Sequence, residues 1–349
     1  EAERPRKDPV LVCWYSGGFR HADGEKLLAD ITQGAAGYGI REQLVLGFPD
    51  HYGIDGVGSE CWPKYVDRLV QEIDGTRDYK DRPLLLFGHS RGAEAAMSLA
   101  TRLDRGRVLK IYIVACGPIR LGEPTSWESL SETFKEEGTK AMLSWFSTLQ
   151  PDNVLLASTS RLPLDEMNKR ISESKWLTDT VDLMRVQYMN AMYPKMSGDS
   201  PDISLLAVPI VCVSPLLDAG SQPEVMEAWA QSTTGQFQLI TVNAGHMDCL
   251  EKGHRLMERL GPDMINTARD PQRCPLIPVQ SLDEASASRP VAPAKTGKAA
   301  HLGPLWPISS LDSLWDLAVH AVVEELPAMS SPPPQPQEAA AEAQEGIGG

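Results

Sequence analysis

Six short apolar runs are spread along the chain, and most of them are separated by stretches with a helical pattern. Each run is almost continuous in Val, Ile, Leu and aromatic residues, with little alternation of polar positions. Strands of this kind are buried on both faces, as in parallel sheets that helices cover on each side. The pattern therefore predicts an α/β protein with a mostly parallel, doubly wound sheet, whose strands are residues 9–15, 42–48, 83–88, 110–116, 208–213 and 237–243.

Residues 122–204, between the fourth and fifth runs, do not alternate with strands. Residues 126–149 and 174–196 have the spacing of amphipathic helices, so we expect a helical lid inserted into a core made of residues 9–121 and 205–262. Its flexible and aromatic side chains suit a variable apolar ligand, although packing of the lid on the core is the alternative role for each of them. The candidate substrate-binding residues are Met189, Met192, Trp145 and Phe146.

The C-terminal part of the chain differs in composition. Residues 270–304 are rich in Ala, Pro and Lys and predict a flexible linker or insertion, and residues 328–349 predict a disordered tail. Between them, residues 305–327 contain an apolar stripe with helical spacing. This amphipathic helix must bury its stripe, either on the sheet or on a partner protein.

The third apolar run ends in Gly88-His89-Ser90-Arg91-Gly92, and an Ala-rich amphipathic run follows at once. A sharp turn from strand to helix crowds its flanks, and glycine removes the Cβ atoms that would collide there. Ser90 would then be the exposed nucleophile of such a turn. The amide of Arg91, at the start of the helix, would stabilise negative charge on an attacked carbonyl.

A serine nucleophile needs a base, and the base needs a carboxylate to orient it. Of the seven histidines, His246 stands in a small-residue turn after a strand and is the candidate base. Asp218 follows the fifth apolar run and completes the chain order serine, acid, histidine. Asp248 is the alternative acid, but it is poorly placed because it lies only two residues from His246. His89 is expected to be a packing residue.

Three segments resemble the type II thioesterases, the editing hydrolases of polyketide and nonribosomal peptide synthases. They are "LVCWYSGG", "FGHSRGAEAAMSLATRL" and "EAWAQSTTGQFQLITVNAGH", and the similarity covers roughly residues 9–260. In the last segment the matching positions are Trp229, Thr233, Gly235, Phe237, Leu239, Gly245 and His246. The resemblance implies the α/β-hydrolase fold with a helical lid. It also implies hydrolysis of acyl thioesters carried on phosphopantetheine, on acyl carrier protein or CoA, through an acyl-serine and without a metal or organic cofactor.

The chain departs from the family pattern in three places. Its first glycine-rich turn is one residue shorter and lacks the usual proline, so either Tyr15 or Ser16 could supply the second oxyanion amide beside that of Arg91. The second loop reads "GFPDHYG", and Arg91 stands where methionine is common. A carboxylesterase, or an acyltransferase or cyclase that releases a polyketide chain, remains the alternative function.

Net charge and cysteine content limit the binding partners and the cellular compartment that we expect. The net charge of −14 argues against nucleic-acid binding. The sequence contains no run of 18 apolar residues, so no membrane span is predicted. The six cysteines show no metal-type pairing and predict buried free thiols in a reducing compartment, the cytoplasm or a plastid. The resemblance implies docking of a carrier protein, which is acidic and would need a basic patch. Arg102, Arg105, Arg107 and Lys110 are one candidate for it, although the sequence favours an ordinary solvated helix end and turn there. The oligomeric state is left open.

Overall fold

The computed structural model of the chain describes residues 8–54, 61–76, 78–103, 106–118, 138–149, 153–184, 206–271 and 289–291. Its strands are β1 (Val10–Trp14), β2 (Glu42–Val45), β3 (Leu84–His89), β4 (Val108–Val114), β5 (Ile210–Pro215), β6 (Phe237–Val242) and β7 (Arg289–Val291). Its longer helices are α1 (His21–Leu27), α2 (Ala29–Gly37), α3 (Cys61–Gly75), α4 (Gly92–Arg102), α6 (Thr139–Leu149), α7 (Val154–Ser160), α8 (Leu164–Glu173), α9 (Lys175–Met184) and α12 (Gly253–Arg269). The short ones are α10 (Pro223–Met226), α11 (Asp248–Glu251) and the 3-10 helices η1 (Pro49–Tyr52), η3 (Ala219–Ser221) and η4 (Glu227–Ser232).

The strands form one sheet in the order β2-β1-β3-β4-β5-β6-β7. All neighbours from β2 to β6 are parallel, and only β7 runs antiparallel, to β6. The predicted parallel sheet is therefore confirmed, and each of the six apolar runs is a strand. The chain passes from β1 to β2 on one side and then to β3 on the other, so a crevice is expected at the carboxyl ends of β1 and β3.

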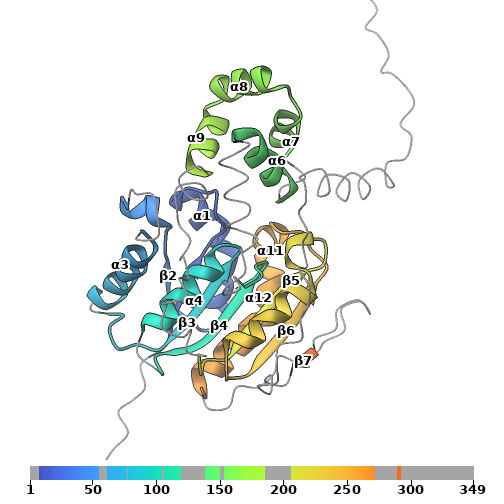
Figure 1. Cartoon of the computed structure of the whole chain (residues 1–349). Coiled ribbons are helices and arrows are strands. Elements are labelled where there is room, and N and C mark those ends of the chain that lie inside the picture. The colour runs from blue at the N-terminus through green and yellow to red at the C-terminus, as the bar shows by residue number, and fades with distance from the viewer. Residues whose placement is uncertain are drawn as a thin grey trace, which may run out of the picture. The chain divides into compact units, whose positions relative to one another are not determined.

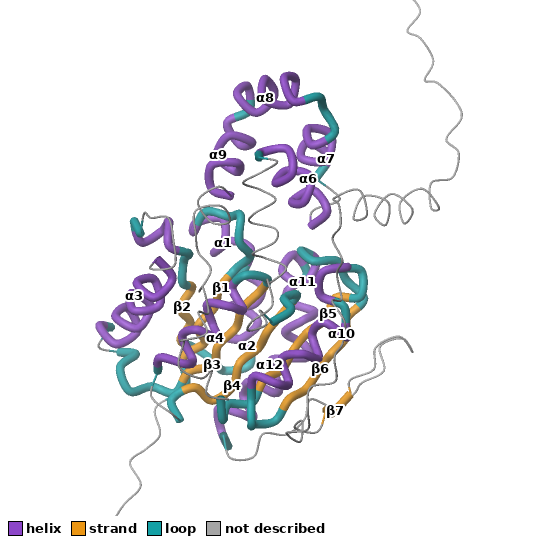
Figure 2. The backbone as a smooth tube through the Cα atoms, in the orientation of Figure 1, coloured by secondary structure: helices purple, strands orange, loops and turns teal. Residues whose placement is uncertain are grey.

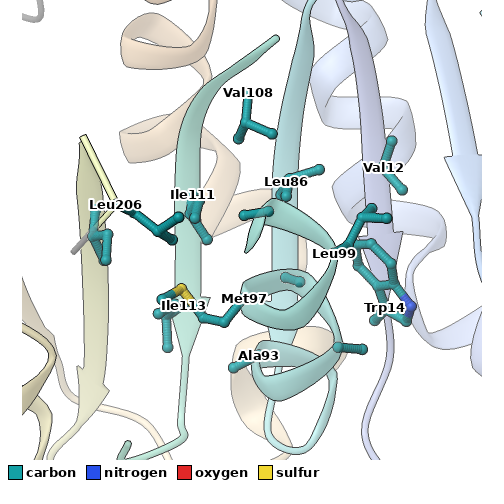
Figure 3. Packing of buried hydrophobic residues seen from close by; sticks show 14 of the residues in the cluster. Val12, Trp14, Leu86, Ala93, Met97, Leu99, Val108, Ile111, Ile113 and Leu206 are labelled. Atoms are coloured by element: carbon teal, nitrogen blue, oxygen red, sulfur yellow. The ribbon is translucent and has the colours of Figure 1, made fainter. Parts of the chain in front are cut away.

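Both faces of this sheet are buried. In β1, Val10, Val12 and Trp14 belong to one apolar cluster, whereas Leu11 and Cys13 belong to a second. The first cluster includes side chains of α3 and α4, and Figure 3 shows residues of β1, β3, β4 and α4 meeting in it. The second includes side chains of α2 and α12. Figures 1 and 2 show the strands as a twisted central layer between helices.

The insertion after β4 is helical where the structure describes it, from α6 to α9 (Figure 1). Two of these helices, α7 and α8, fall between the two that the sequence predicts. Asn153 caps α7 by accepting a hydrogen bond from the Leu156 amide at 3.1 Å, and Pro163 directly precedes α8. Residues 126–137, 185–196 and 305–349 lie outside the described residues.

Two smaller findings bear on the sequence predictions. The strand β7 lies within residues 270–304, which the sequence describes as linker or insertion. Four cysteines, Cys13, Cys116, Cys212 and Cys249, are buried free thiols, as predicted. Across the described ranges, the helices are too short or too polar to traverse a lipid bilayer.

Candidate active site

The turn between β3 and α4 holds Ser90 in an unusual backbone conformation. Its φ of 51° lies in the left-handed region, which costs a non-glycine residue about 1–3 kcal/mol. A Cβ on Gly88 would lie 2.4 Å from the Gly92 carbonyl oxygen, and one on Gly92 would lie 2.6 Å from the Trp14 Cβ. Glycine is therefore required on both sides of Ser90. The Ser90 amide donates to the Val114 carbonyl at 2.8 Å, which fixes the turn to the end of β4.

His246 and Asp218 come together from the ends of β6 and β5. The Nδ1 atom of His246 lies 2.6 Å from the Asp218 Oδ2 atom, and both side chains are buried. Asp218 also accepts hydrogen bonds from the Gly220 amide, at 3.0 Å, and from the Ser221 hydroxyl. The Nε2 atom of His246 is buried and has no hydrogen-bond partner among the described residues, Ser90 included. Ser90 is itself buried, whereas the sequence predicts an exposed serine, because the turn lies within the packed end of the sheet.

The environment of Asp218 favours the ionised carboxylate, which is the form that can orient the imidazole of His246. Burial alone would raise the pKa of its carboxyl, but His246, Ser221 and Gly220 act in the opposite direction and together lower it. Asp218 is therefore a carboxylate near neutral pH. A carboxylate accepts a hydrogen bond from the Nδ1–H group of the imidazole, which keeps that proton on Nδ1 and leaves the lone pair on Nε2.

Asp248, the alternative acid, is committed to other partners. One of its oxygens accepts from the Gly245 amide at 2.7 Å, and the other accepts from Lys252 Nζ at 2.8 Å. Among the described residues it has no hydrogen bond with His246. Its carboxylate shapes the turn in front of His246.

His89, which directly precedes Ser90, supports the backbone of His246. Its Nε2 atom lies 2.8 Å from the His246 carbonyl oxygen, and because a carbonyl only accepts, Nε2 must carry the proton. Burial, and then the proximity of His246, lowers the pKa of His89 to about 3, so the ring is neutral. The sequence predicts only packing here, because nothing in it reveals a contact across 157 positions.

The residues proposed for the oxyanion hole follow the carboxyl ends of the neighbouring strands β1 and β3. Arg91 precedes the first residue of α4, so its amide lies at the positive end of the helix dipole. Tyr15 and Ser16 follow β1, the strand that pairs with β3, and both are buried. The Tyr15 ring packs on Gly24, where a Cβ would come within 2.2 Å of it, and meets Phe48 edge-on at 5.3 Å.

No family model matches the chain, and no curated protein does. Similar solved structures include the RedJ thioesterase of the prodiginine pathway of Streptomyces coelicolor, at 17% identity, with 75% of this chain and 90% of that chain covered and a TM-score of 0.45. The type II thioesterase BorB of the borrelidin cluster is 18% identical, with 76% and 94% covered and a TM-score of 0.43. An enol-lactonase from Burkholderia xenovorans LB400 is 15% identical, with 76% and 94% covered and a TM-score of 0.44.

Two buried ionisable residues, Arg91 before the first residue of α4 and Glu94 within it, lie close to Ser90 in the chain. The Arg91 Nε atom is 3.8 Å from a Glu94 carboxyl oxygen, and the guanidinium lies 5.8 Å from the Trp62 ring centroid. Neither oxygen of Glu94 has a hydrogen-bond partner among the described residues. The sequence shows Arg91 as a departure from its family pattern but does not show that its side chain and Glu94 are buried.

The lid residues proposed for substrate binding are only partly described. Met189 and Met192 lie outside the described residues, and so does the side chain of Trp145. Phe146 is 2% exposed and packs against the turn after β1, where its ring approaches Gly18 and Phe19. These contacts join the insertion to the turn after β1.

The predicted basic patch is wrong. Lys110 is 2% exposed and donates to both oxygens of Asp263, at 2.8 and 3.0 Å. Arg107 pairs with Asp74 and donates to the Tyr79 carbonyl at 3.0 Å, so it is used inside the fold. Arg105 lies outside the described residues. Arg102 alone remains as an exposed cation, 3.7 Å from Asp67.

The described ranges contain no group of three or more His, Cys, Asp or Glu side chains that could hold a metal ion. The other histidines considered lie in separate contacts. His51 stacks on His21 with ring centroids 3.8 Å apart, and His254 lies 3.3 Å from Asp30.

Proposed function

We propose that the chain is a serine hydrolase that cleaves acyl thioesters carried on phosphopantetheine. The observation that carries the proposal is the buried Asp218–His246 pair, at 2.6 Å, on the sheet edge where Ser90 occupies a strained turn. Strain is retained where the surrounding structure over-determines it, and such places are frequently functional. A serine, an oriented imidazole and a helix N-terminus together are the components of acyl transfer.

The reaction has two halves. In the first, His246 Nε2 takes the proton of the Ser90 hydroxyl while its oxygen attacks the thioester carbonyl carbon. The tetrahedral intermediate then expels the thiol, which takes the proton from the imidazolium, and an acyl-serine remains. In the second half, His246 removes a proton from water, which attacks the acyl-serine, and the proton returns to Ser90 as the free acid leaves.

Two further contributions lower the barrier. Asp218 holds the Nδ1 proton of His246 and stabilises the imidazolium that forms in each half. The amide of Arg91 and that of Tyr15 or Ser16 donate to the oxyanion of both tetrahedral intermediates, and each such donor is typically worth about 10²–10³ in kcat. The reaction written in this way requires no metal or organic cofactor.

The thioester part of the proposal depends on the resemblance to type II thioesterases. A phosphopantetheine arm presents its thioester at the end of a long flexible chain, on either an acyl carrier protein or CoA. This substrate class belongs to polyketide or fatty-acid type biosynthesis. A free ester would enter the same chemistry with an alkoxide as the leaving group, so the leaving group distinguishes the two functions.

The test is intact-protein mass spectrometry after brief exposure to a panel of acyl-phosphopantetheine thioesters, together with turnover of p-nitrophenyl esters of equal chain length. We expect an acyl adduct that Ser90→Ala abolishes, and faster turnover of the thioesters. Ser98→Ala, in the same helix, is the matched control and should keep the adduct. An acyl adduct on the Ser90→Ala protein would refute the assignment of Ser90 as the nucleophile. Faster turnover of the free esters would favour a carboxylesterase. Transfer of the acyl group only to an added alcohol or amine, and not to water, would favour an acyltransferase.

A further inference from the structure

The turn that follows β1 makes contacts on two sides. On the inner side, Tyr15 is fixed between Gly24 and Phe48. On the outer side, the next residues meet two helices of the insertion, α6 and α9, which are far away in the sequence. This turn is where the second oxyanion amide lies under the proposed function, so its conformation bears on catalysis.

The contact with α6 is made by Phe146. Gly18 has a φ of 87°, and a Cβ placed there would lie 2.9 Å from the Phe146 Cζ atom and 3.0 Å from its Cε2 atom. The ring of Phe19 lies at a centroid distance of 6.5 Å from that of Phe146, with the planes at 61°. Glycine at position 18 thus serves two needs at once, the left-handed conformation and the space for the aromatic ring.

The contact with α9 is an ion pair. Arg20 Nη2 lies 3.0 Å from the Oδ1 atom of Asp179, and Lys175 Nζ donates a hydrogen bond to the Oδ2 atom of the same carboxylate at 2.8 Å. The Lys175 hydrogen bond and the charge of Arg20 lower the pKa of Asp179, so it is a carboxylate at neutral pH. A cleft of about 340 Å³ lies beside the pair and is lined by Arg20, Asp50, Asp179, Asp182 and Leu183.

We propose that Phe146 and Asp179 are positioning residues for the oxyanion hole. They hold residues 18–20 from the lid side, so that the amide of Tyr15 or Ser16 faces the carbonyl attacked by Ser90. The inference rests on the proposed function, because it gives the turn a role only if Ser90 forms an acyl-enzyme. The turn contains Gly17 and Gly18, which lose more backbone freedom on ordering than other residues, so contacts from outside are needed to keep it in one conformation.

This role predicts a different kinetic signature from substrate binding. A residue that contacts the acyl chain affects long substrates more than short ones, largely through KM. A residue that positions an oxyanion donor acts in the transition state and lowers kcat for every chain length. Loosening a donor should cost less than removing one, so we expect about 10- to 100-fold for Phe146→Ala. The ion pair is exposed at Arg20, and such pairs contribute little, so about fivefold is the upper limit for breaking it.

The first experiment measures kcat and KM of Phe146→Ala and Phe146→Leu with a short and a long acyl thioester. We expect equal losses of kcat for both substrates, a near-constant KM and partial rescue by leucine. Leu143→Ala is the matched control, because Leu143 is also buried in α6, and it should change the melting temperature more than kcat. A loss confined to the long substrate would overturn the inference and leave Phe146 as an acyl-chain contact.

The second experiment does not depend on the folding of the Phe146 variants. Arg20→Asp and Asp179→Arg should each lower kcat by up to about fivefold, and the combined reversal should restore most of it. Additive losses in the double variant would overturn the role of the ion pair. Labelling of Ser90 by a fluorophosphonate distinguishes failure of the proposed function from failure of the positioning role. If the unmodified protein is not labelled, the proposed function fails. If it is labelled and active but the variants behave like Leu143→Ala, only the positioning role fails.

Discussion

Replacing Glu94 by glutamine should change how the stability of the protein depends on pH. Glu94 is 4% exposed, and its carboxyl oxygens have no hydrogen-bond partner among the described residues. Burial raises the pKa of its carboxyl from the ordinary value of 4.5 to about 7, although the charge of Arg91 acts in the opposite direction. Glutamine has nearly the same shape and carries no charge at any pH.

The sign and size of the effect follow from proton linkage. Between about pH 4.5 and 7 the folded protein keeps a proton on Glu94 that the unfolded chain has released. The free energy of unfolding therefore falls as the pH rises through this window and stays low above it. A pKa difference of about 2.5 between the two states corresponds to about 3 kcal/mol. Because the unfolded carboxyl is already partly ionised at pH 5, about 2–3 kcal/mol remains between pH 5 and pH 8.

The assay is urea denaturation of the unmodified protein and of Glu94→Gln at these two pH values. The variant should gain about 2–3 kcal/mol relative to the unmodified protein on going from pH 5 to pH 8. Glu258→Gln is the control, since it removes an exposed carboxylate from α12 and should leave the pH dependence unchanged. Parallel pH profiles for Glu94→Gln and the unmodified protein would refute the reasoning. They would mean that Arg91 keeps Glu94 ionised inside the fold.

Three further variants test other parts of the site and core. Asp218→Asn should lower kcat for thioester hydrolysis by about 10³- to 10⁴-fold, whereas Asp248→Asn should cost far less because its carboxylate holds a turn; the opposite ranking would make Asp248 the acid. His89→Phe should lower kcat by removing the hydrogen bond to the backbone of the catalytic base, yet leave the pH–rate profile unmoved because His89 is neutral; a displaced profile would show that His89 titrates. Asp263→Asn should cost about 3–5 kcal/mol in urea denaturation, since Lys110 would be buried without its charge partner, and an unchanged midpoint would contradict that pairing.

The sheet could be predicted from the sequence because burial on both faces leaves a local signal. The strands β1, β3, β4 and β5 are buried runs of mostly apolar residues, so their composition alone separates them from the helices around them. Lys110 is the exception within β4. A lysine beside arginines at the end of an apolar run suggests a solvated surface, and its partner Asp263 is 153 positions away. Long-range pairing of this kind leaves no trace in local composition.

The sharp turn around Ser90 could be predicted for a similar reason. The crowding that requires Gly88 and Gly92 acts between residues within a few positions of Ser90, so the motif itself contains the information. Asp218 and His246 were indicated by their places after strands and by their order in the chain. The sequence could not show that His89 supports the backbone of His246, because that contact depends on how β3 and β6 are placed in space. The lid helices α7 and α8 were missed because their caps, Asn153 and Pro163, stand in a segment without a regular apolar stripe.

The shorter first turn gives a physical reason for the contacts that it makes with the lid. A proline in such a turn fixes φ and lowers the entropy that ordering costs, and this turn lacks the proline common in the family that the chain resembles. With glycine at positions 17 and 18 instead, ordering two residues costs roughly 2–4 kcal/mol in backbone entropy. Burial of an aromatic ring such as Phe146 is worth about 1.5–3 kcal/mol, and the pair between Arg20 and Asp179 adds up to about 1 kcal/mol. These contributions are comparable with the entropy they must offset. The conformation of the turn then depends on the insertion, and a change in the lid helices should affect the proposed oxyanion hole without any change in Ser90, Asp218 or His246.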